Sequence, residues 1–169
     1  MAVRKLKIVL IEDSPTARRF YQMAFVSAGF EVLEADCARL GWNLIRQQHP
    51  DIIVLDMLLP DVPGIEVLKK IRFTEHSKDI PVIVLTSLKE IDHIQEAIIQ
   101  GASYYSIKGK DTPEKIMEMI YKLIKKLHDQ KLKREADLAK ERELDAITAY
   151  EEDYEDIEFI KDDKGEQKF

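Results

Sequence analysis

Two apolar runs that end in acidic residues constrain the fold of this chain most strongly. They are Val9-Leu10-Ile11-Glu12-Asp13 and Ile52-Ile53-Val54-Leu55-Asp56. Each has about the length of a strand and is apolar at consecutive positions, as in a parallel strand covered on both faces. Neighbouring parallel strands end at the same edge of a sheet. We therefore expect Glu12, Asp13 and Asp56 to meet at the carboxyl edge, where open α/β folds bind ligands.

Carboxylates that lie a few ångströms apart repel one another, and a hard divalent cation with oxygen ligands relieves this repulsion. The sequence therefore predicts a cation site at this edge. Taken alone, Glu12 and Asp13 are typical of a solvated strand end, and Asp56 is typical of a turn cap. The prediction depends on their being placed together.

Strand-like runs recur five times, with segments of helical character between them, which predicts an α/β fold with a parallel sheet. Ser14-Pro15 and Thr112-Pro113 are each typical of an N-cap followed by the first helical residue. Asp36 is expected to cap the second helix. The expected strands cover residues 7–12, 31–35, 51–56, 81–86 and 103–107, and the third and fourth helices are expected after Gly64 and over residues 91–100.

The length of 169 residues, with 45% hydrophobic residues, suits one compact domain with an extension. Cys37 is the only cysteine, so an internal disulfide is excluded, and the sequence contains no signal peptide or long apolar span. We expect a reduced, cytoplasmic protein that does not insert into a membrane.

Charge divides the chain near residue 127. Residues 1–127 hold 18 Lys or Arg and 17 Asp or Glu, whereas residues 128–169 hold 8 and 15. This acidic balance argues against direct binding of nucleic acid. We expect a domain over residues 1–127, a helical extension over 128–150 and an acidic tail over 151–169.

In their order and spacing, the motifs over residues 5–127 resemble a bacterial response-regulator receiver domain. The motifs are Glu12-Asp13, Asp56 within residues 56–64, Thr86-Ser87, and residues 101–108, which end in Lys108. The resemblance implies a doubly wound, five-stranded parallel sheet of the flavodoxin-like (βα)5 type, here with a long C-terminal helix. It also implies a two-component signalling protein that is not an enzyme, apart from catalysing its own phosphorylation and dephosphorylation.

The resemblance also assigns roles in the acidic cluster. The position of Asp56 is that of the phosphoacceptor, a carboxylate nucleophile that forms an acyl phosphate. Asp13, Asp56 and the carbonyl group of Leu58 would hold Mg²⁺, and Glu12 would reach the ion through water. The metal offsets both the carboxylate repulsion and the charge on the transferring group.

Three more residues take roles from the resemblance. Lys108 supplies a cation, and Thr86 a hydroxyl, to the phosphoryl oxygens. In the family, inward movement of this threonine is followed by an aromatic residue. Counting back from Lys108 identifies that residue as Tyr105, with its neighbour Tyr104 as the alternative. Thr86 and Tyr105 are therefore the expected switch.

Two of the chain's departures from the family pattern concern the backbone near the site. Gly109 stands where a proline usually follows the lysine. A trans bond and a looser loop are expected there, because a non-proline cis bond costs about 2.5 to 4 kcal/mol. Pro63 replaces the usual aspartate or serine before Gly64, which removes a capping side chain from the third helix.

The leading interpretation is a stand-alone regulator that accepts phosphate from a histidine kinase or phosphotransfer protein and signals to a downstream protein, with a homodimer left open. One alternative is a receiver segment of a longer regulator, in which the helix is a linker or dimerisation element. A haloacid-dehalogenase-like phosphatase would need a second aspartate at Leu58. A pseudo-receiver scaffold is disfavoured because the acidic pocket is complete.

The fifth helix has no stop signal before about Tyr150. Residues 131–149 contain neither Gly nor Pro and are rich in residues with high helix propensity. The apolar seam of Ile116, Ile120, Leu123 and Leu127 does not continue beyond residue 127. A coiled coil, a solvated charged helix and a partner-docking helix therefore remain open.

Overall fold

The computed structural model describes residues 4–87 and 94–155, with side chains in the second range as far as Thr148. The first residues of the expected fourth helix, 91–93, and the tail from residue 156 onward lie outside this description. Among the described helices, none is long and apolar enough to cross a membrane.

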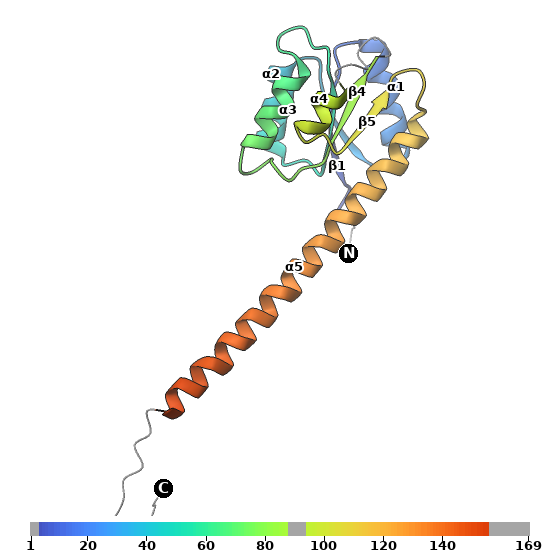
Figure 1. Ribbon diagram of the computed structural model, residues 1–169. Coiled ribbons are helices and arrows are strands. Elements are labelled where there is room, and N and C mark those ends of the chain that lie inside the picture. The colour runs from blue at the N-terminus through green and yellow to red at the C-terminus, as the bar shows by residue number, and fades with distance from the viewer. Residues whose placement is uncertain (1–3, 88–93, 156–169) are drawn as a thin grey trace, which may run out of the picture. The chain divides into compact units, whose positions relative to one another are not determined.

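Five parallel strands form one sheet in the order β2-β1-β3-β4-β5 (Figure 1). The expected strands are confirmed to within one residue at each end. Strands β3 and β4 are buried along their whole length, as their uninterrupted apolar sequences predicted. The strands are β1 (Lys7–Ile11), β2 (Glu31–Ala35), β3 (Ile52–Asp56), β4 (Val82–Thr86) and β5 (Tyr104–Ile107).

Strands β1 and β3 are neighbours although β2 separates them in the sequence, so the strand order reverses at this pair. In their register, Ile11 lies opposite Leu55. Glu12 and Asp13 therefore leave β1 at the edge where Asp56 ends β3. Such a switch point opens a crevice at the carboxyl ends of the strands, and it is the usual ligand position in open α/β sheets.

Helices cover both faces of the sheet (Figure 1). One face packs against α1 (Pro15–Ser27) and the first turns of α5 (Pro113–Glu155), through Phe25, Ile116 and Ile120. The other face packs against α2 (Ala38–Gln48), α3 (Gly64–Phe73) and α4 (Ile94–Ile99). The expected doubly wound fold is thereby confirmed.

The helix caps follow the sequence at α1 but not at α2. The Ser14 side chain accepts a hydrogen bond from the Ala17 amide, as expected for an N-cap. The prediction that Asp36 caps α2 is wrong, because the N-cap is Cys37 and it makes no side-chain cap bond. Asp61, in the loop before α3, caps α2 instead. Its carboxylate accepts hydrogen bonds from the amides of Ala38 at 2.8 Å and Arg39 at 2.9 Å.

Pro63 provides no side-chain cap for α3, as its sequence position predicted. The bond after Lys108 is trans. The loop that follows is held by Asp111, which accepts from the Ile107 amide at 3.0 Å and from Lys115 Nζ at 2.6 Å. These contacts argue against the expected looseness of this loop.

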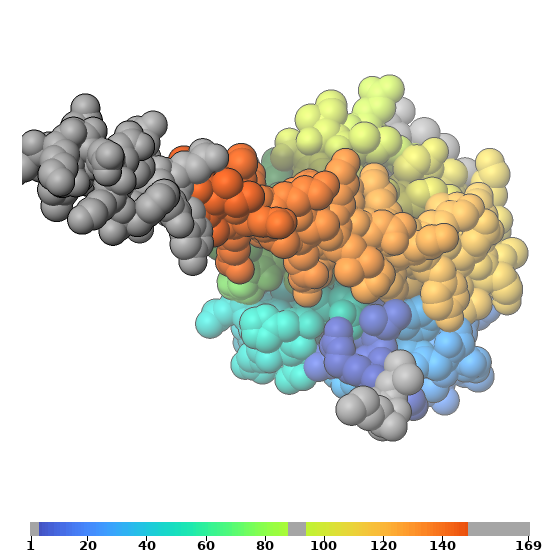
Figure 2. Space-filling view, turned by 90° about the horizontal axis from the view of Figure 1, so that it is seen from below, coloured from blue at the N-terminus to red at the C-terminus, as the bar shows by residue number. Residues whose placement is uncertain are grey.

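Helix α5 continues for 43 residues, from Pro113 to Glu155. The chain divides into two compact units, residues 1–125 and 126–169. In the second unit, every described side chain from His128 to Thr148 is exposed, and Figure 2 displays this stretch in orange to red. Lys131 Nζ and Glu135 Oε1 lie 3.9 Å apart there and form an ion pair across one turn of the helix.

Candidate functional site: an acidic pocket at the carboxyl edge of the sheet

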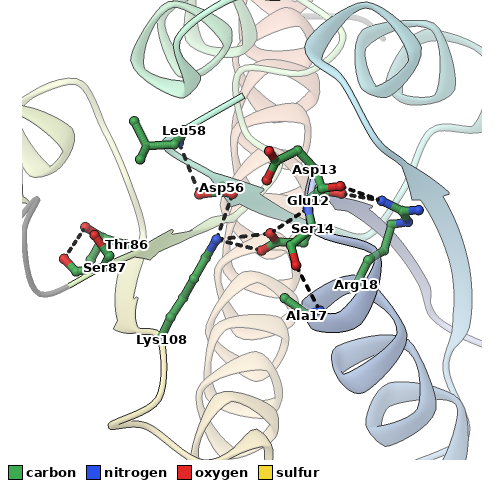
Figure 3. A network of polar contacts seen from close by, with 10 residues as sticks. All are labelled: Glu12, Asp13, Ser14, Ala17, Arg18, Asp56, Leu58, Thr86, Ser87 and Lys108. Carbon is green, nitrogen blue, oxygen red and sulfur yellow. Dashed lines mark hydrogen bonds and ion pairs between the residues drawn. The ribbon is translucent and has the colours of Figure 1, made fainter. Parts of the chain in front are cut away.

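The structure brings Glu12, Asp13 and Asp56 together at the ends of β1 and β3 (Figure 3). One carboxylate oxygen from each lies within 4.8 Å of the other two. Glu12 and Asp56 are buried, with 0% and 1% of their surface exposed, whereas Asp13 is exposed. The pocket thus has two buried acids at its base and one at its mouth.

Lys108 places its ammonium group between the two buried acids (Figure 3). Its Nζ lies 2.7 Å from Asp56 Oδ2 and 2.8 Å from Glu12 Oε2. The Lys108 amide donates to the carbonyl oxygen of Thr86 at 2.8 Å, which fixes the lysine at the end of β5. One cation therefore compensates two buried carboxylates.

The pocket shifts the pKa values of its own groups. Burial raises the pKa of Glu12 from its ordinary 4.5 to about 7, although its hydrogen bond with Lys108 opposes the shift. Burial likewise raises the pKa of Asp56, again against the effect of Lys108. Burial alone would lower the pKa of Lys108, but its hydrogen bonds with Asp56 and Glu12 outweigh burial and raise it.

Backbone amides orient both buried carboxylates. The Leu58 amide donates to Asp56 Oδ1 at 3.1 Å, and the Ser14 amide donates to Glu12 Oε1 at 3.2 Å. The Leu58 side chain, in contrast, is 63% exposed. Leu58 therefore meets the pocket through its main chain, the part of the residue that the family resemblance assigned to the metal.

The donor set fits a hard divalent cation. It consists of convergent carboxylate oxygens, which Mg²⁺ prefers, and two of the three acids share a single lysine. Glu12 Oε2 is buried, and within the described residues its contact with Lys108 Nζ at 2.8 Å is an ion pair that lacks hydrogen-bond geometry. A second cation at the mouth of the pocket would offset the remaining negative charge.

Thr86 ends β4 at the same edge, where it pairs with Ile107 in the register. It is 1% exposed, and its hydroxyl donates to the carbonyl oxygen of Ser87 at 3.3 Å. Tyr105 lies on β5 opposite Val84, partly buried against the core on the α2, α3 and α4 side. Tyr104 packs against the opposite core, but its ring stacks on that of Tyr105, with the ring centroids 5.8 Å apart.

Two residues beside the pocket were not among the site residues expected from the sequence. Arg18, in α1, donates to the main-chain carbonyl groups of Glu12 and Asp13 (Figure 3). Gly64 lies so close to the backbone of Asp56 that an added Cβ would overlap the Asp56 carbonyl oxygen and lie 2.7 Å from Met57 Cα. Contacts with main-chain atoms leave no residue pattern, although an arginine in the first turns after an acid pair is a clue.

Known proteins are similar to this chain in sequence. Residues 8–121 match the family model of the response regulator receiver domain. The Escherichia coli regulatory protein AtoC is 34% identical over 108 residues, which cover 64% of this chain and 23% of AtoC. The phosphate regulon transcriptional regulatory protein PhoB of Pseudomonas aeruginosa is 34% identical over 101 residues, covering 60% of this chain and 44% of PhoB.

Solved structures agree in fold. A response regulator receiver domain protein from Clostridium thermocellum superposes with a TM-score of 0.68 at 25% identity, covering 73% of this chain and 97% of that chain. The chemotaxis response regulator CheY4 of Vibrio cholerae gives 0.65 at 24% identity, covering 71% and 99%. This chain spans less than half the length of the curated relatives cited above. Because the family model matches well over half of the chain, the chain belongs to the response regulator receiver domain family of two-component signalling proteins.

Proposed function

We propose that this chain is a response regulator that accepts a phosphoryl group from a histidine kinase on Asp56, and that phosphorylation switches its binding to a downstream protein. The observation that carries the proposal is the convergence of three carboxylates and Lys108 at the switch point of a receiver sheet. Together they supply a nucleophile, ligands for a cation and a cation for the phosphoryl group.

Asp56 is the proposed nucleophile because it alone ends the central strand within this cluster. One carboxylate oxygen would attack phosphorus, and the P–N bond of the phosphohistidine donor would break as the acyl phosphate forms. The Leu58 amide contacts one oxygen of the Asp56 carboxylate and Lys108 contacts the other, which limits rotation of the group. After transfer, Lys108 is placed to exchange its contact with Asp56 for one with a phosphoryl oxygen.

We propose that Asp13, Asp56 and the Leu58 carbonyl hold Mg²⁺, with Glu12 acting through water. Bound there, the ion would neutralise charge on the carboxylates and on the transferring group. Because Glu12 is buried, it is better placed to hold the water molecules around the metal than to take up an ion directly from solvent. Asp13, which is exposed, is the acid most accessible to an arriving ion.

The proposed response runs through Thr86 and Tyr105. The Thr86 hydroxyl, now bonded to the Ser87 carbonyl, would turn to a phosphoryl oxygen on Asp56. Tyr105 is only partly buried on the edge strand β5, so it has room to change its packing. A surface that includes Tyr105 would thereby differ between the two phosphorylation states.

A second candidate is that the chain is the receiver segment of a longer regulator. The short coverage of AtoC and PhoB supports it, since both are named as regulatory proteins and extend far beyond the matched region. In that case α5 would link the receiver to another domain or join two copies. The intact mass of the protein isolated from its own cells distinguishes this candidate from a stand-alone regulator.

The experiment for the proposed function is phosphorylation of the full chain by a small phosphodonor, with either Mg²⁺ or EDTA present. Intact mass should rise by about 80 Da, one phosphoryl group, with Mg²⁺ and not with EDTA. Equal labelling in EDTA would remove the metal from the proposal. No labelling under either condition would contradict phosphoacceptor function.

A further inference from the structure

Arg18 is tied to the backbone of the acid pair from the first turns of α1 (Figure 3). Its Nη1 donates to the carbonyl oxygen of Glu12 at 2.8 Å and to that of Asp13 at 3.2 Å. On its other side, Arg18 Nε lies 3.6 Å from Glu34 Oε1. The arginine side chain is 21% exposed, so these contacts are partly shielded from water.

These bonds restrain two consecutive peptide groups, those after Glu12 and after Asp13. The Glu12 amide is already held by the carbonyl of Ala35 at 3.0 Å, and the Arg18 amide bonds to the carbonyl of Ser14 at 2.8 Å. Arg18 adds a restraint on the orientation of the carbonyl groups of Glu12 and Asp13. Backbone orientation sets the direction in which a side chain leaves the chain. By restraining the backbone, Arg18 fixes the direction in which the Glu12 and Asp13 carboxylates point.

Building on the proposed function, we propose that Arg18, oriented by Glu34, is a positioning residue for the Mg²⁺ site. It touches neither the metal nor the phosphoryl group, and it acts by holding the main chain of the acid pair. The proposed role is analogous to the hydrogen bonds around known metal sites, whose loss typically lowers metal affinity by about 10- to 100-fold.

Charge and positioning predict opposite results when Arg18 is replaced. A positive charge near a cation site weakens cation binding, so neutralising it would raise the affinity for Mg²⁺ if charge alone mattered. Positioning predicts a lower affinity instead. Arg19 is the matched control, since it carries the same charge at the next position but contacts Gln22 on the exposed side of α1.

The test titrates the full chain with Mg²⁺ and follows the backbone amide NMR signals of residues 12–14 and 56–58. Arg18→Met should lower the Mg²⁺ affinity by about 10-fold, and Arg19→Met should leave it unchanged. Arg18→Lys keeps the positive charge but loses the planar guanidinium, so it should lower the affinity less, in the same direction, and it keeps the test decisive if Arg18→Met fails to fold. In the metal-free protein, hydrogen exchange at the Ser14 amide should be faster in Arg18→Met than in Arg19→Met.

The outcomes separate this inference from the proposed function. If the wild-type chain does not bind Mg²⁺, the metal site of the proposed function fails. If the wild type binds Mg²⁺ and folded Arg18→Met binds it equally well or more tightly, only the positioning role is overturned. An equal loss in Arg18→Met and Arg19→Met would also overturn it, because the effect would then not depend on the main-chain contacts that Arg18 makes and Arg19 does not.

Discussion

Lys108 and Asp56 form an ion pair of 2.7 Å at the carboxyl edge of the sheet, and the same ammonium group serves Glu12 at 2.8 Å. The arrangement leaves the pocket with one more buried carboxylate than it has buried cations. In the metal-free protein, a proton on Glu12 reduces this excess of buried negative charge, in agreement with the raised pKa of Glu12, about 7.

The free energy of unfolding of the metal-free protein should therefore depend on the protonation of Glu12. The folded chain keeps this proton up to about pH 7, whereas an unfolded chain releases it near the ordinary pKa of 4.5. The native state binds more protons between these values, so stability from this group falls as pH rises through the window. Glu12→Gln should flatten that fall and be more stable than wild type at pH 8.

Urea unfolding in EDTA at pH 5 and pH 8 measures this effect, with the exposed Glu31→Gln as the control. The control should keep the wild-type difference between the two pH values. If Glu12→Gln also keeps it, Glu12 does not hold the proton.

Gly64 should be intolerant of a side chain. A Cβ there overlaps the Asp56 carbonyl oxygen, and the Gly64 amide bonds to the Met57 carbonyl at 2.9 Å, so the backbone that carries the phosphoacceptor would have to move. Gly64→Ala should lower the free energy of unfolding by about 1 to 3 kcal/mol and slow phosphorylation. Urea unfolding and the time course of labelling measure both effects. Wild-type values for both would refute the close contact.

Asp61 should stabilise α2 although it lies outside that helix. Its carboxylate accepts from the amides of Ala38 and Arg39, and these bonds, together with others from its own loop, overcome the opposing effect of burial and lower its pKa. Asp61→Ala should cost about 1 kcal/mol, as the loss of an N-cap does. The contribution is present above the ordinary pKa of 3.8 and should vanish as pH falls through the lower folded value.

The control for Asp61 is Asp36→Ala, which removes the residue whose position in the sequence suggested the cap. Its urea midpoint should correspond to a change within about 0.5 kcal/mol of wild type, as for an ordinary surface substitution. A larger loss in Asp36→Ala than in Asp61→Ala would reverse this assignment.

These two aspartates illustrate what the sequence could and could not predict. Local signals worked: apolar runs located the strands, and Ser14-Pro15 located the start of α1. The α2 cap was missed because Asp61 lies 23 residues from Ala38, and no local pattern encodes such a pairing. The acid pair and Asp56 were expected to meet because both end parallel strands, whereas the place of Lys108 followed only from the family resemblance.

Truncation after Leu127 should leave phosphorylation intact, because every pocket residue lies within residues 8–121. It should abolish self-association or partner binding, since an isolated helix is marginal in water and needs contacts to be fixed. Four large apolar side chains, each at least 51% exposed, are available for such contacts: Leu132, Leu138, Leu144 and Ile147. Light scattering and partner binding compare the two chains. If the truncated and full chains have the same oligomeric state and the same partner affinity, the extension is only a solvated appendage.

The central claim is that Asp56 is the phosphoacceptor, and intact mass of site variants after treatment with a small phosphodonor and Mg²⁺ tests it most directly. Asp51 precedes the same strand at its opposite end, so Asp51→Asn is the matched control. Wild type and Asp51→Asn should each gain about 80 Da, one phosphoryl group, whereas Asp56→Asn should gain none. Labelling of folded Asp56→Asn to the wild-type extent would contradict the account.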